Sequence, residues 1–460
     1  MFTPELLSPA GTLKNMRYAF AYGADAVYAG QPRYSLRVRN NDFKLENLAT
    51  GIAEAHAQNR KFYLASNIMP HNSKLTTYLA DMEPVIAMGP DALIMSDPGL
   101  IMLVRERWPE VPIHLSVQAN AMNWATVKFW YSVGVERVIL SRELSLDEIE
   151  EIRQRCPEME LEVFVHGALC IAYSGRCLLS GYINHRDPNQ GTCTNACRWK
   201  YDAHEAKEDA SGDLVPAESS LSAEGSAPVQ PFDPATDESR PQLGEGKPTD
   251  KIFLLQEQTR PGEYMPAFED EHGTYIMNSK DLRAIQHVER LTKMGVHSLK
   301  IEGRTKSHYY VARTAQVYRK AIDDAAAGRP FDKGLMDVLE NLANRGYTEG
   351  FYRRHVHDEY QNYQTGNSVG VHQQFVGEVI GLNDGMLEID VKNRFEKGDT
   401  LELMTPQGNR RFRLDEMINR KGQVVDAAPG NGHVVRIPLP LEADMSHALL
   451  MRDLGNAPKG

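Results

Sequence analysis

Residues 161–198, LEVFVHGALCIAYSGRCLLSGYINHRDPNQGTCTNACR, contain four of the five cysteines of the chain. The segment starts with an apolar, strand-like run, 161–165, which leads through His166 and Gly167 into glycine-rich sequence. Six, fifteen and three residues separate the cysteines, which are Cys170, Cys177, Cys193 and Cys197. A strand end followed by glycine turns and clustered thiols predicts a functional site at this point of the fold.

The strand before this site is the last of a series. Apolar runs alternate with helix-like segments from the N-terminus onward, at residues 5–7, 26–28, 62–65, 92–95, 113–117, 138–140 and 163–165. Strands that alternate with helices at this pitch pair in parallel. These seven runs and an eighth at 298–301 predict an α/β fold with a closed, TIM-like (β/α) barrel. An open doubly wound sheet is the alternative, although no GxGxxG motif follows an early strand.

The rest of the chain divides by composition. Residues 1–200 hold the first part of the barrel with the cysteine cluster. Residues 201–250 carry twelve Asp and Glu against three Lys and Arg and lack apolar periodicity, which predicts an acidic, flexible insertion. The barrel pattern resumes over 251–345, with helix starts expected at 279–282 and near 309. Residues 346–372 read as a connector, and the period-two pattern of 373–455 predicts a small antiparallel β-barrel.

The net charge of −11 is concentrated in the acidic insertion, which accounts for −9. The remaining −2 leaves room for a local basic face that could bind RNA phosphates. The hydrophobic fraction of 42% and charged fraction of 25% are those of a soluble globular protein. There is no run of eighteen apolar residues and no secretory signal, so we expect a cytoplasmic protein without a membrane partner. Cys156, in a polar helical segment, is interpreted as structural or incidental.

Clustered cysteines in a reducing compartment indicate a metal site or a catalytic thiol. Structural zinc uses two close ligand pairs, and only Cys193 and Cys197 are so spaced. An iron–sulfur cluster tolerates looser spacing and fits the pattern better, while four metal-free thiols remain the third alternative. A thiol peptidase would pair Cys170 with His166, but that pairing leaves three thiols unexplained.

Long polar side chains follow several of the strand-like runs. Barrel active sites are built at the carboxyl ends of the strands, so these side chains should converge on one rim. Capping of the next helix is the alternative explanation for Ser8, Ser96 and Asp97. Capping explains Gln118, Arg142, Glu143 and Lys300 less well, because these residue types are not preferred at helix N-termini.

The motifs EVFVHGALC (162–170) and YSGRC (173–177) resemble those of the collagenase-like, or unassigned-type, peptidase family. SPAG (8–11), DAVYAG (25–30) and LKIEGR (299–304) match as well, so the resemblance spans nearly the whole chain. It implies an iron–sulfur protein, since family members that hydroxylate RNA or quinones carry such clusters and the RNA members depend on prephenate. In some relatives the fourth cluster ligand lies far downstream, whereas this chain has no cysteine after Cys197.

The resemblance therefore implies C5 hydroxylation of a wobble uridine in tRNA, giving 5-hydroxyuridine without molecular oxygen. A 4Fe–4S cluster would be held by Cys170, Cys177, Cys193 and Cys197. An electron-transfer or cluster-assembly partner is compatible with this chemistry. The rival functions are a cysteine-type peptidase and a non-catalytic RNA-binding partner.

Roles for the remaining polar residues follow from their chemistry. A carboxylate donor such as prephenate needs cations, and amide side chains can pair with the edge of uracil. Tyrosines can stack bases or pack in the core, and basic residues can contact phosphate or form a solvated face. The candidates are Arg37, Arg142, Lys300 and Arg304 as cations; Asn67, Gln118, Asn120 and Asn278 as amides; His166, Glu143 and Glu302 as catalytic groups; Tyr28, Tyr34, Tyr173 and Tyr309 for stacking; and Arg313, Arg319, Lys320, Arg345, Arg353 and Arg354 for phosphate.

Overall fold

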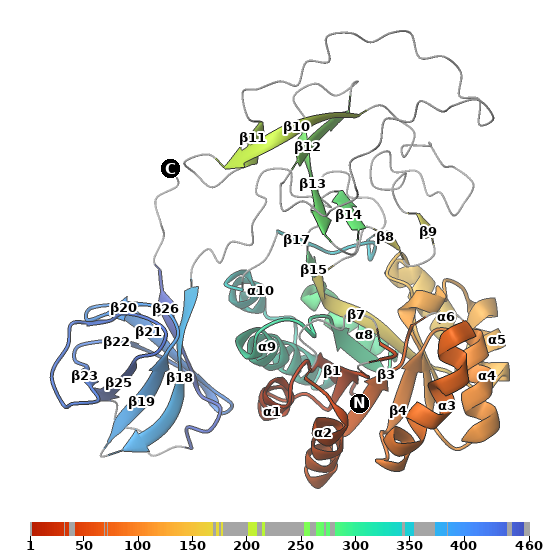
Figure 1. The fold of residues 1–460 in the computed structure, drawn as a ribbon, viewed down its shortest axis with the longest axis horizontal. Helices are drawn as coiled ribbons and strands as arrows, with labels where there is room; N and C mark the ends of the chain where they lie inside the picture. Colours follow the sequence, from red (N-terminus) through yellow and green to blue (C-terminus); the bar gives the residue numbers. More distant parts are fainter. Residues whose placement is uncertain are drawn as a thin grey trace.

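Eight parallel strands form a closed barrel in the computed structural model (Figure 1). The ring closes because the last strand, β16, pairs in parallel with both the first, β1, and the seventh, β7. The predicted (β/α) barrel is confirmed, and all eight predicted runs are its strands. They are β1 (Glu5–Pro9), β2 (Ala26–Gly30), β3 (Lys61–Ala65), β4 (Ala92–Met95), β5 (Ile113–Leu115), β6 (Arg137–Ile139), β7 (Glu160–Ala168) and β16 (Ser298–Ile301).

The structure describes most of the barrel and of the C-terminal domain, and between residues 172 and 276 it describes only the backbone of certain strands. The described residues are 2–31, 33–35, 42–68, 70, 72–168, 172–173, 176–177, 201–208, 214–216, 253–257, 264–270, 273–276, 281–342, 346–353, 373–383, 385–438 and 444–454.

Helices surround the barrel, and polar caps start several of them. Asp97 accepts a 2.8 Å hydrogen bond from the backbone N–H of Leu100 and so caps α4, which confirms the capping alternative for this residue. None of the described helices is long and apolar enough to cross a membrane. The helices are α1 (Leu13–Ala21), α2 (Leu45–Ala57), α3 (Asn72–Ala87), α4 (Pro98–Arg107), η1 (Val117–Ala119), α5 (Trp124–Ser132), α6 (Leu146–Arg155), η4 (Ile285–His287), α8 (Val288–Lys293), α9 (His308–Ala326) and α10 (Gly334–Glu340).

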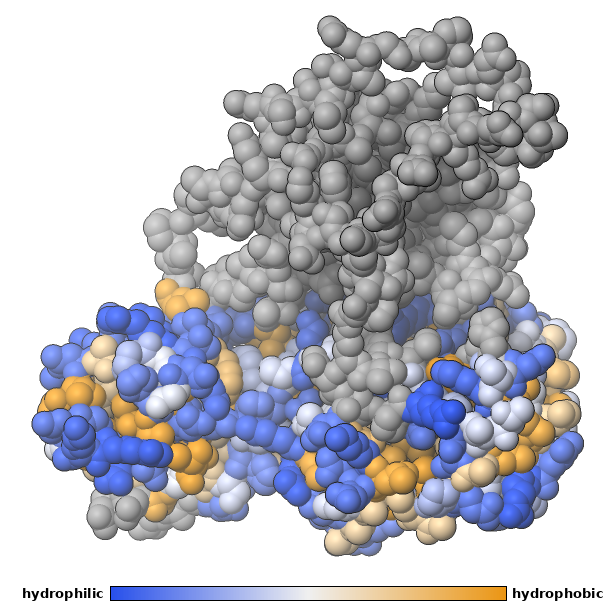
Figure 2. Space-filling view, in the orientation of Figure 1, coloured by the Kyte–Doolittle hydropathy of each residue, from blue (hydrophilic) through white to orange (hydrophobic). Residues whose placement is uncertain are grey.

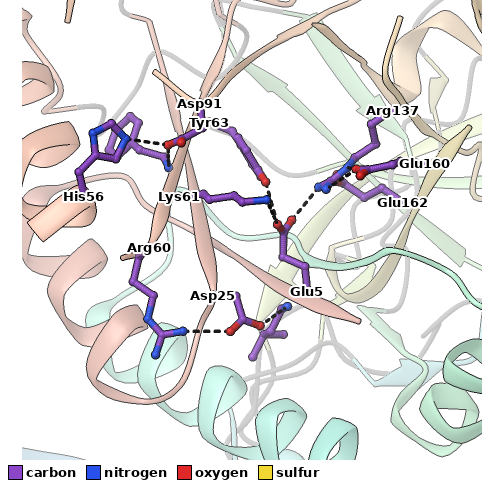
Figure 3. Close-up of polar contacts among 12 residues, drawn as sticks. Glu5, Asp25, His56, Arg60, Lys61, Tyr63, Asp91, Arg137, Glu160 and Glu162 are labelled. Carbon is purple, nitrogen blue, oxygen red and sulfur yellow. Dashed lines mark hydrogen bonds and ion pairs between the residues drawn. The ribbon is translucent and has the colours of Figure 1, made fainter. Parts of the chain in front are cut away.

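The barrel interior carries a buried ion network near the strands' N-terminal ends (Figure 3). Arg137 Nη1 lies 2.6 Å from Glu5 Oε1 and 3.2 Å from Glu162 Oε2. Lys300 Nζ lies 2.8 Å from Glu162 Oε1, and Tyr63 Oη donates to Glu5 Oε2 at 2.7 Å. TIM barrel interiors are usually filled by branched apolar side chains. Here two carboxylates and two cations neutralise one another in that space instead.

A short strand lies between the seventh and eighth barrel strands in the chain, where the sequence predicts a helix. Residues 279–282 have the pattern of a helix start, but β15 (Asp281–Arg283) pairs antiparallel with the end of β7, so that prediction is wrong. β7 extends past the ring and offers free backbone groups there, and pairing with them outweighs local helix propensity. β17 (Tyr347–Thr348) pairs with β15, and Tyr352 Oη donates to the Phe164 carbonyl at 2.5 Å. The first residues of the expected connector therefore belong to the barrel.

A second, antiparallel sheet brackets the acidic segment. Its strands are β10 (Tyr201–Glu208), β11 (Leu214–Pro216), β12 (Phe253–Glu257), β13 (Tyr264–Asp270) and β14 (Gly273–Ile276), in the order β11-β10-β12-β13-β14. This corrects the expected boundaries, because strands occupy both the start of the 201–250 insertion and the part assigned to the barrel after residue 250. Polar residues interrupt the apolar ones in β10, which hides this strand from a search for apolar runs, whereas β12 begins with three consecutive apolar residues. Residues 217–252 lie outside the described part.

The C-terminal domain has the expected antiparallel strands and a hydrophobic core of its own. The sheet order is β22-β21-β26-β18-β19-β25-β23, and a two-stranded ladder, β20–β24, lies beside it. The strands are β18 (Gln373–Asn383), β19 (Met386–Val391), β20 (Phe395–Glu396), β21 (Thr400–Thr405), β22 (Gly408–Arg413), β23 (Ile418–Asn419), β24 (Ala427–Ala428), β25 (Val434–Pro438) and β26 (Leu449–Asp453).

Polar contacts hold this domain against α1 and α9 of the barrel. Arg313 of α9 is buried and binds Glu402 of β21 at 2.8 Å. Tyr22 Oη donates to the carbonyls of Met404 and His447 at 3.1 and 2.9 Å. Met404, Leu449 and Met451 also pack into the hydrophobic core of the barrel. The two domains therefore share one interface of apolar and charged groups.

Glu378 of β18 makes this interface sensitive to acid. Burial favours a higher pKa, but hydrogen bonds from His308 and Lys14 lower the pKa of Glu378 to about 2. Between pH 4.5 and about 2, the Glu378 carboxyl is protonated in the unfolded chain but ionised in the folded chain. The stabilisation by Glu378 should therefore be complete above pH 4.5 and should fall as the pH drops through that window.

We expect Glu378→Gln to remove this dependence. Urea unfolding at a series of pH values should show the variant less stable than the unaltered protein near neutral pH and the difference shrinking below pH 4.5. Glu83→Gln, which alters an exposed carboxylate paired with Arg107, serves as the control. A stability difference that stays constant down to the acid limit would contradict the assignment.

Candidate active site

The end of β7 leads into the cysteine segment, and the backbone of Glu302 and the strand β15 hold it in place. The Glu302 backbone N–H donates to the His166 carbonyl at 2.8 Å, and β15 pairs with residues 166–168. Gly167 has a φ of +105°, and a Cβ placed there would lie 2.4 Å from the Glu302 carbonyl oxygen. Only glycine fits this close approach of two strands. The chain is thus held firmly two residues before Cys170.

Arg142, from the loop after β6, supports the same strand end. Its Nη1 donates to the Ala168 carbonyl at 2.8 Å, and its guanidinium lies 3.9 Å from the centre of the Phe164 ring. Its Nη2 is 3.6 Å from Glu302 Oε2. The structure therefore brings Arg142, Glu302 and the end of β7 together at the mouth of the barrel, as the sequence predicts.

His166 is buried among aromatic side chains. Tyr318 Oη lies 3.3 Å from His166 Nδ1, and the rings of Tyr310, Tyr318 and Tyr347 lie 5.5–5.9 Å from the imidazole. Burial, with the positive charges of Arg283 and Lys306, lowers the pKa of His166 to about 3, so the imidazole is neutral at physiological pH. Its Nε2 forms no hydrogen bond with any described residue.

Two sets of hydrogen-bonded polar side chains follow the ends of β3, β5 and β6. Asn67 Nδ2 donates to Gln118 Oε1 at 2.5 Å, which joins the ends of β3 and β5. The Ser141 hydroxyl bonds Asn120 Oδ1 at 3.3 Å and also bonds the Glu143 carboxylate. Asn120 has a left-handed backbone, φ 63°, which turns the chain after η1. The predicted amide side chains of residues 67, 118 and 120 are thus placed on the rim in pairs.

Lys300 is not on the rim, which corrects the sequence prediction. Its side chain is buried in the barrel interior, bound to Glu162, and its ammonium lies 4.3 Å from the centre of the Tyr28 ring. Burial lowers the pKa of Lys300 although Glu162 opposes this effect. Arg304, in the loop after β16, is also buried, and its guanidinium lies 5.9 Å from the centre of the Tyr28 ring. Arg37 and Asn278 lie outside the described residues.

The four predicted cluster ligands fall in or beside the part that the structure leaves undescribed. Only the backbone of Cys177 is described, in a hairpin of β8 (Ala172–Tyr173) and β9 (Arg176–Cys177). The register pairs Cys177 with Ala172, which brings Cys177 back beside the chain that leaves Cys170. This path suits a shared site for those two thiols. Cys156 is buried, and its thiol donates to the Trp124 carbonyl at 3.4 Å, in line with a structural role.

Three residues predicted to bind phosphate are already engaged within the protein. Arg313 is buried against Glu402, Arg319 binds Asp25 at 2.8 Å and Asp323 at 2.9 Å, and Lys320 binds Asp324 at 2.6 Å. Arg313 and Arg319 are therefore not available for the expected phosphate contacts, whereas Lys320 is half exposed and its contact with phosphate stays a prediction. Arg353 is exposed and pairs with Glu349 at 2.8 Å, while Arg345 and Arg354 lie outside the described part.

The aromatic residues around His166 are the part of the site that sequence reasoning missed. Tyr310, Tyr318 and Tyr347 come from α9 and β17, far from His166 in the chain. Tyr310 and Tyr318 stand eight residues apart on one helix face, which is the only local signal. Tyr28, Tyr34 and Tyr309, considered for base stacking, are buried and pack in the core.

Comparison with known families decides the classification of this site and fold. Residues 11–362 match the description "Peptidase family U32", and residues 372–452 match "Peptidase family U32 C-terminal domain". The chain belongs to peptidase family U32. This is the family that the sequence motifs predict, and its two matched regions coincide with the barrel and the C-terminal domain.

Individual relatives resemble the chain over most of its length. It is 69% identical over 454 residues to tRNA hydroxylation protein P of Escherichia coli, covering 98% of this chain and 97% of that protein. A 23S rRNA 5-hydroxycytidine synthase of Escherichia coli is 27% identical over 458 residues, covering 96% and 59% of the two chains. The solved structure of the U32 peptidase Mk0906 is 12% identical, covers 43% of this chain and 85% of its own, and gives a TM-score of 0.33.

Gly167→Ala tests how tightly the strand end is held. The left-handed φ alone costs about 1–3 kcal/mol for a residue with a Cβ, and the contact with the Glu302 carbonyl adds to it. We expect a lower urea midpoint than for Gly328→Ala, a control with a φ of +71° and no atom within 4 Å of its Cβ. Equal destabilisation of the two variants would show that the Glu302 backbone simply moves aside.

Proposed function

We propose that this chain hydroxylates tRNA, converting a wobble uridine to 5-hydroxyuridine. The similarity to tRNA hydroxylation protein P across nearly the full length of both chains carries the proposal. The relation to an enzyme that makes 5-hydroxycytidine in rRNA supports C5 of a pyrimidine as the reacting atom. The half-buried amide and carboxylate groups around the barrel mouth lie where barrel enzymes bind their substrates.

Cys170, Cys177, Cys193 and Cys197 would hold a 4Fe–4S cluster. The donor chemistry fits, since four thiols occur within one segment, and the β8–β9 hairpin returns Cys177 beside the chain after Cys170. When bound, such a cluster supplies redox or Lewis-acid chemistry at the barrel mouth. Gly167 and Arg142 fix the backbone that enters this segment. His166, kept neutral by burial, can donate or accept one hydrogen bond through Nε2.

Replacing the C5–H bond of uridine by C5–OH is a two-electron oxidation, so an oxygen donor is needed. Prephenate is the proposed source of the hydroxyl oxygen, and an electron-transfer partner of the cluster is the proposed acceptor of the two electrons, so no molecular oxygen is required. Its two carboxylates suit the cations Arg142 and Arg304 at the mouth, because guanidinium groups bind carboxylates in pairs of hydrogen bonds. The Asn67–Gln118 pair would contact uracil, whose carbonyl and imide groups complement amides.

A peptidase function, suggested by the family name, finds less support at this site. A thiol protease needs a histidine base oriented by a third group, usually a carboxylate or amide. Among the described residues, the neighbours of His166 are tyrosines, and Tyr318 Oη bonds its Nδ1. A pKa of about 3 makes the imidazole a weak base.

The test is complementation. The gene should be introduced into an Escherichia coli strain that lacks its own tRNA hydroxylation protein P and every other route to this modification. Mass spectrometry of tRNA nucleosides should show 5-hydroxyuridine restored, and the signal should disappear in a host that cannot make prephenate. Soluble expression without any 5-hydroxyuridine would overturn the proposed function, and restoration in the prephenate-free host would overturn the donor assignment.

A further inference from the structure

β22 is an edge strand of the C-terminal sheet with an unusual concentration of arginines. It is at one end of the strand order and, within the described sheet, pairs only with β21. Its sequence, GNRRFR (408–413), places three arginines in four residues, and all three are exposed. Figure 2 shows hydrophilic side chains around separate apolar areas on the visible face of this domain.

The arginines of β22 differ from most others in their partners. Nearly every described arginine elsewhere is bound to a carboxylate or a backbone carbonyl within the protein. The side chains of Arg410 and Arg413 form no ion pair or hydrogen bond with a described residue, and the side chain of Arg411 has only long contacts, 3.5 Å to Glu402 and 3.8 Å to Asp453. Guanidinium groups without internal partners are available for an external anion.

The geometry of the strand spreads these charges along a line. Arg411 and Arg413 point to one side of the sheet, about 6.7 Å apart along the strand, while Arg410 points to the other. Phe412 packs against the domain core and anchors the strand between them. Planar guanidinium groups bind phosphate oxygens bidentately. The edge thus offers phosphate ligands along a rigid strand, two on one face of the sheet and one on the other.

This row has a fixed position relative to the barrel. β21, the neighbour of β22, carries Glu402, which is bound by the buried Arg313 of α9. Gln316 of the same helix donates to Asn409 Oδ1 of β22 at 2.9 Å. An RNA backbone held on β22 would therefore keep a constant distance from the barrel mouth.

We propose that the Arg410–Arg411–Arg413 edge binds the phosphate backbone of the tRNA substrate away from the reacting uridine. The inference rests on the proposed tRNA hydroxylation and assigns to the C-terminal domain the contacts that Arg313 and Arg319 of α9 cannot make. Charged side chains also protect edge strands from pairing with one another. That role alone predicts self-association, not weaker RNA binding, when the charges are removed.

The experiment compares two double variants of the full chain. Arg410→Gln with Arg413→Gln removes two charges from β22. Arg420→Gln with Lys421→Gln removes two exposed charges from the turn after β23, at the other end of the same sheet, and serves as the matched control. Binding of an unmodified tRNA transcript is measured across a salt series, and light scattering reports the oligomeric state.

We expect the β22 variant to bind tRNA about tenfold to a hundredfold more weakly at low salt. Its slope of log affinity against log salt should fall by about 1.4–1.8, as for two lost phosphate contacts. The control should change little. Equal losses in both variants, an unchanged slope, or self-association without loss of binding would overturn the arginine edge while leaving the proposed function intact. Failure of the unaltered protein to bind any tRNA would instead count against the proposed function itself.

Discussion

Replacing any one of Cys170, Cys177, Cys193 and Cys197 by serine is expected to abolish 5-hydroxyuridine formation and to remove most of the bound iron. A cubane cluster needs its full set of thiolates, and serine is a poor substitute ligand for iron. The measurements are iron and sulfide assays with EPR on anaerobically purified protein, together with nucleoside mass spectrometry of tRNA from the complemented strain.

Cys156→Ser is the matched control for these variants. Cys156 is buried, precedes β7, and its thiol donates to the Trp124 carbonyl, which a hydroxyl can also do. This variant should keep both iron and activity. A peptidase would show a different pattern, with loss at Cys170 and His166 but not at Cys177, Cys193 or Cys197. Finding zinc, or no metal, in the unaltered protein would contradict the assignment of an iron–sulfur cluster.

Arg137→Met is expected to destabilise the protein by about 3–5 kcal/mol, because it removes the buried cation that Glu5 and Glu162 share and leaves Lys300 as the only buried cation of this network. Burial by itself lowers the pKa of Arg137, but these two carboxylates raise it above its usual value, so the guanidinium is charged throughout the accessible pH range. Urea unfolding at neutral pH measures the loss.

Arg107→Met provides the comparison on the surface. Arg107 pairs with Glu83 at 3.0 Å, and about half of each side chain is exposed, so its loss should cost about 0–1 kcal/mol. Similar unfolding midpoints for the two variants would contradict the buried network. A double variant, Arg137→Met with Glu5→Gln, should recover part of the lost stability, since one uncompensated charge is removed with its partner.

The order of strands was predictable because each apolar run is local. β1 to β7 and β16 are short runs followed by polar residues, and their alternation with helices specifies parallel pairing. β15 was not predictable in the same way. Its residues carry a helix-start pattern, and they form a strand because β7 presents unpaired backbone beyond the ring. β10 was missed because polar residues interrupt its apolar ones, as its sequence YDAHEAKE shows.

The candidate site was predictable in its residue types but not in their directions. Arg142, Glu302 and the amide residues reach the rim as expected, since they follow strand ends. Lys300 also stands near a strand end, yet it turns into the barrel because Glu162 on the neighbouring strand neutralises it there. Arg313 and Arg319 lie on the polar side of α9, but the C-terminal domain and Asp25 cover that side.

The sequence by itself determined the family, the eight-stranded barrel and the thiol cluster as the place to look for chemistry, because these depend on local runs and short motifs. The tertiary structure decided which charges are available to a ligand. Whether a cation is free depends on which carboxylate another element brings beside it, and that pairing is non-local. Such pairing engages Lys300 and the arginines of α9 within the protein, whereas the arginines of β22 stay exposed and can bind an external anion.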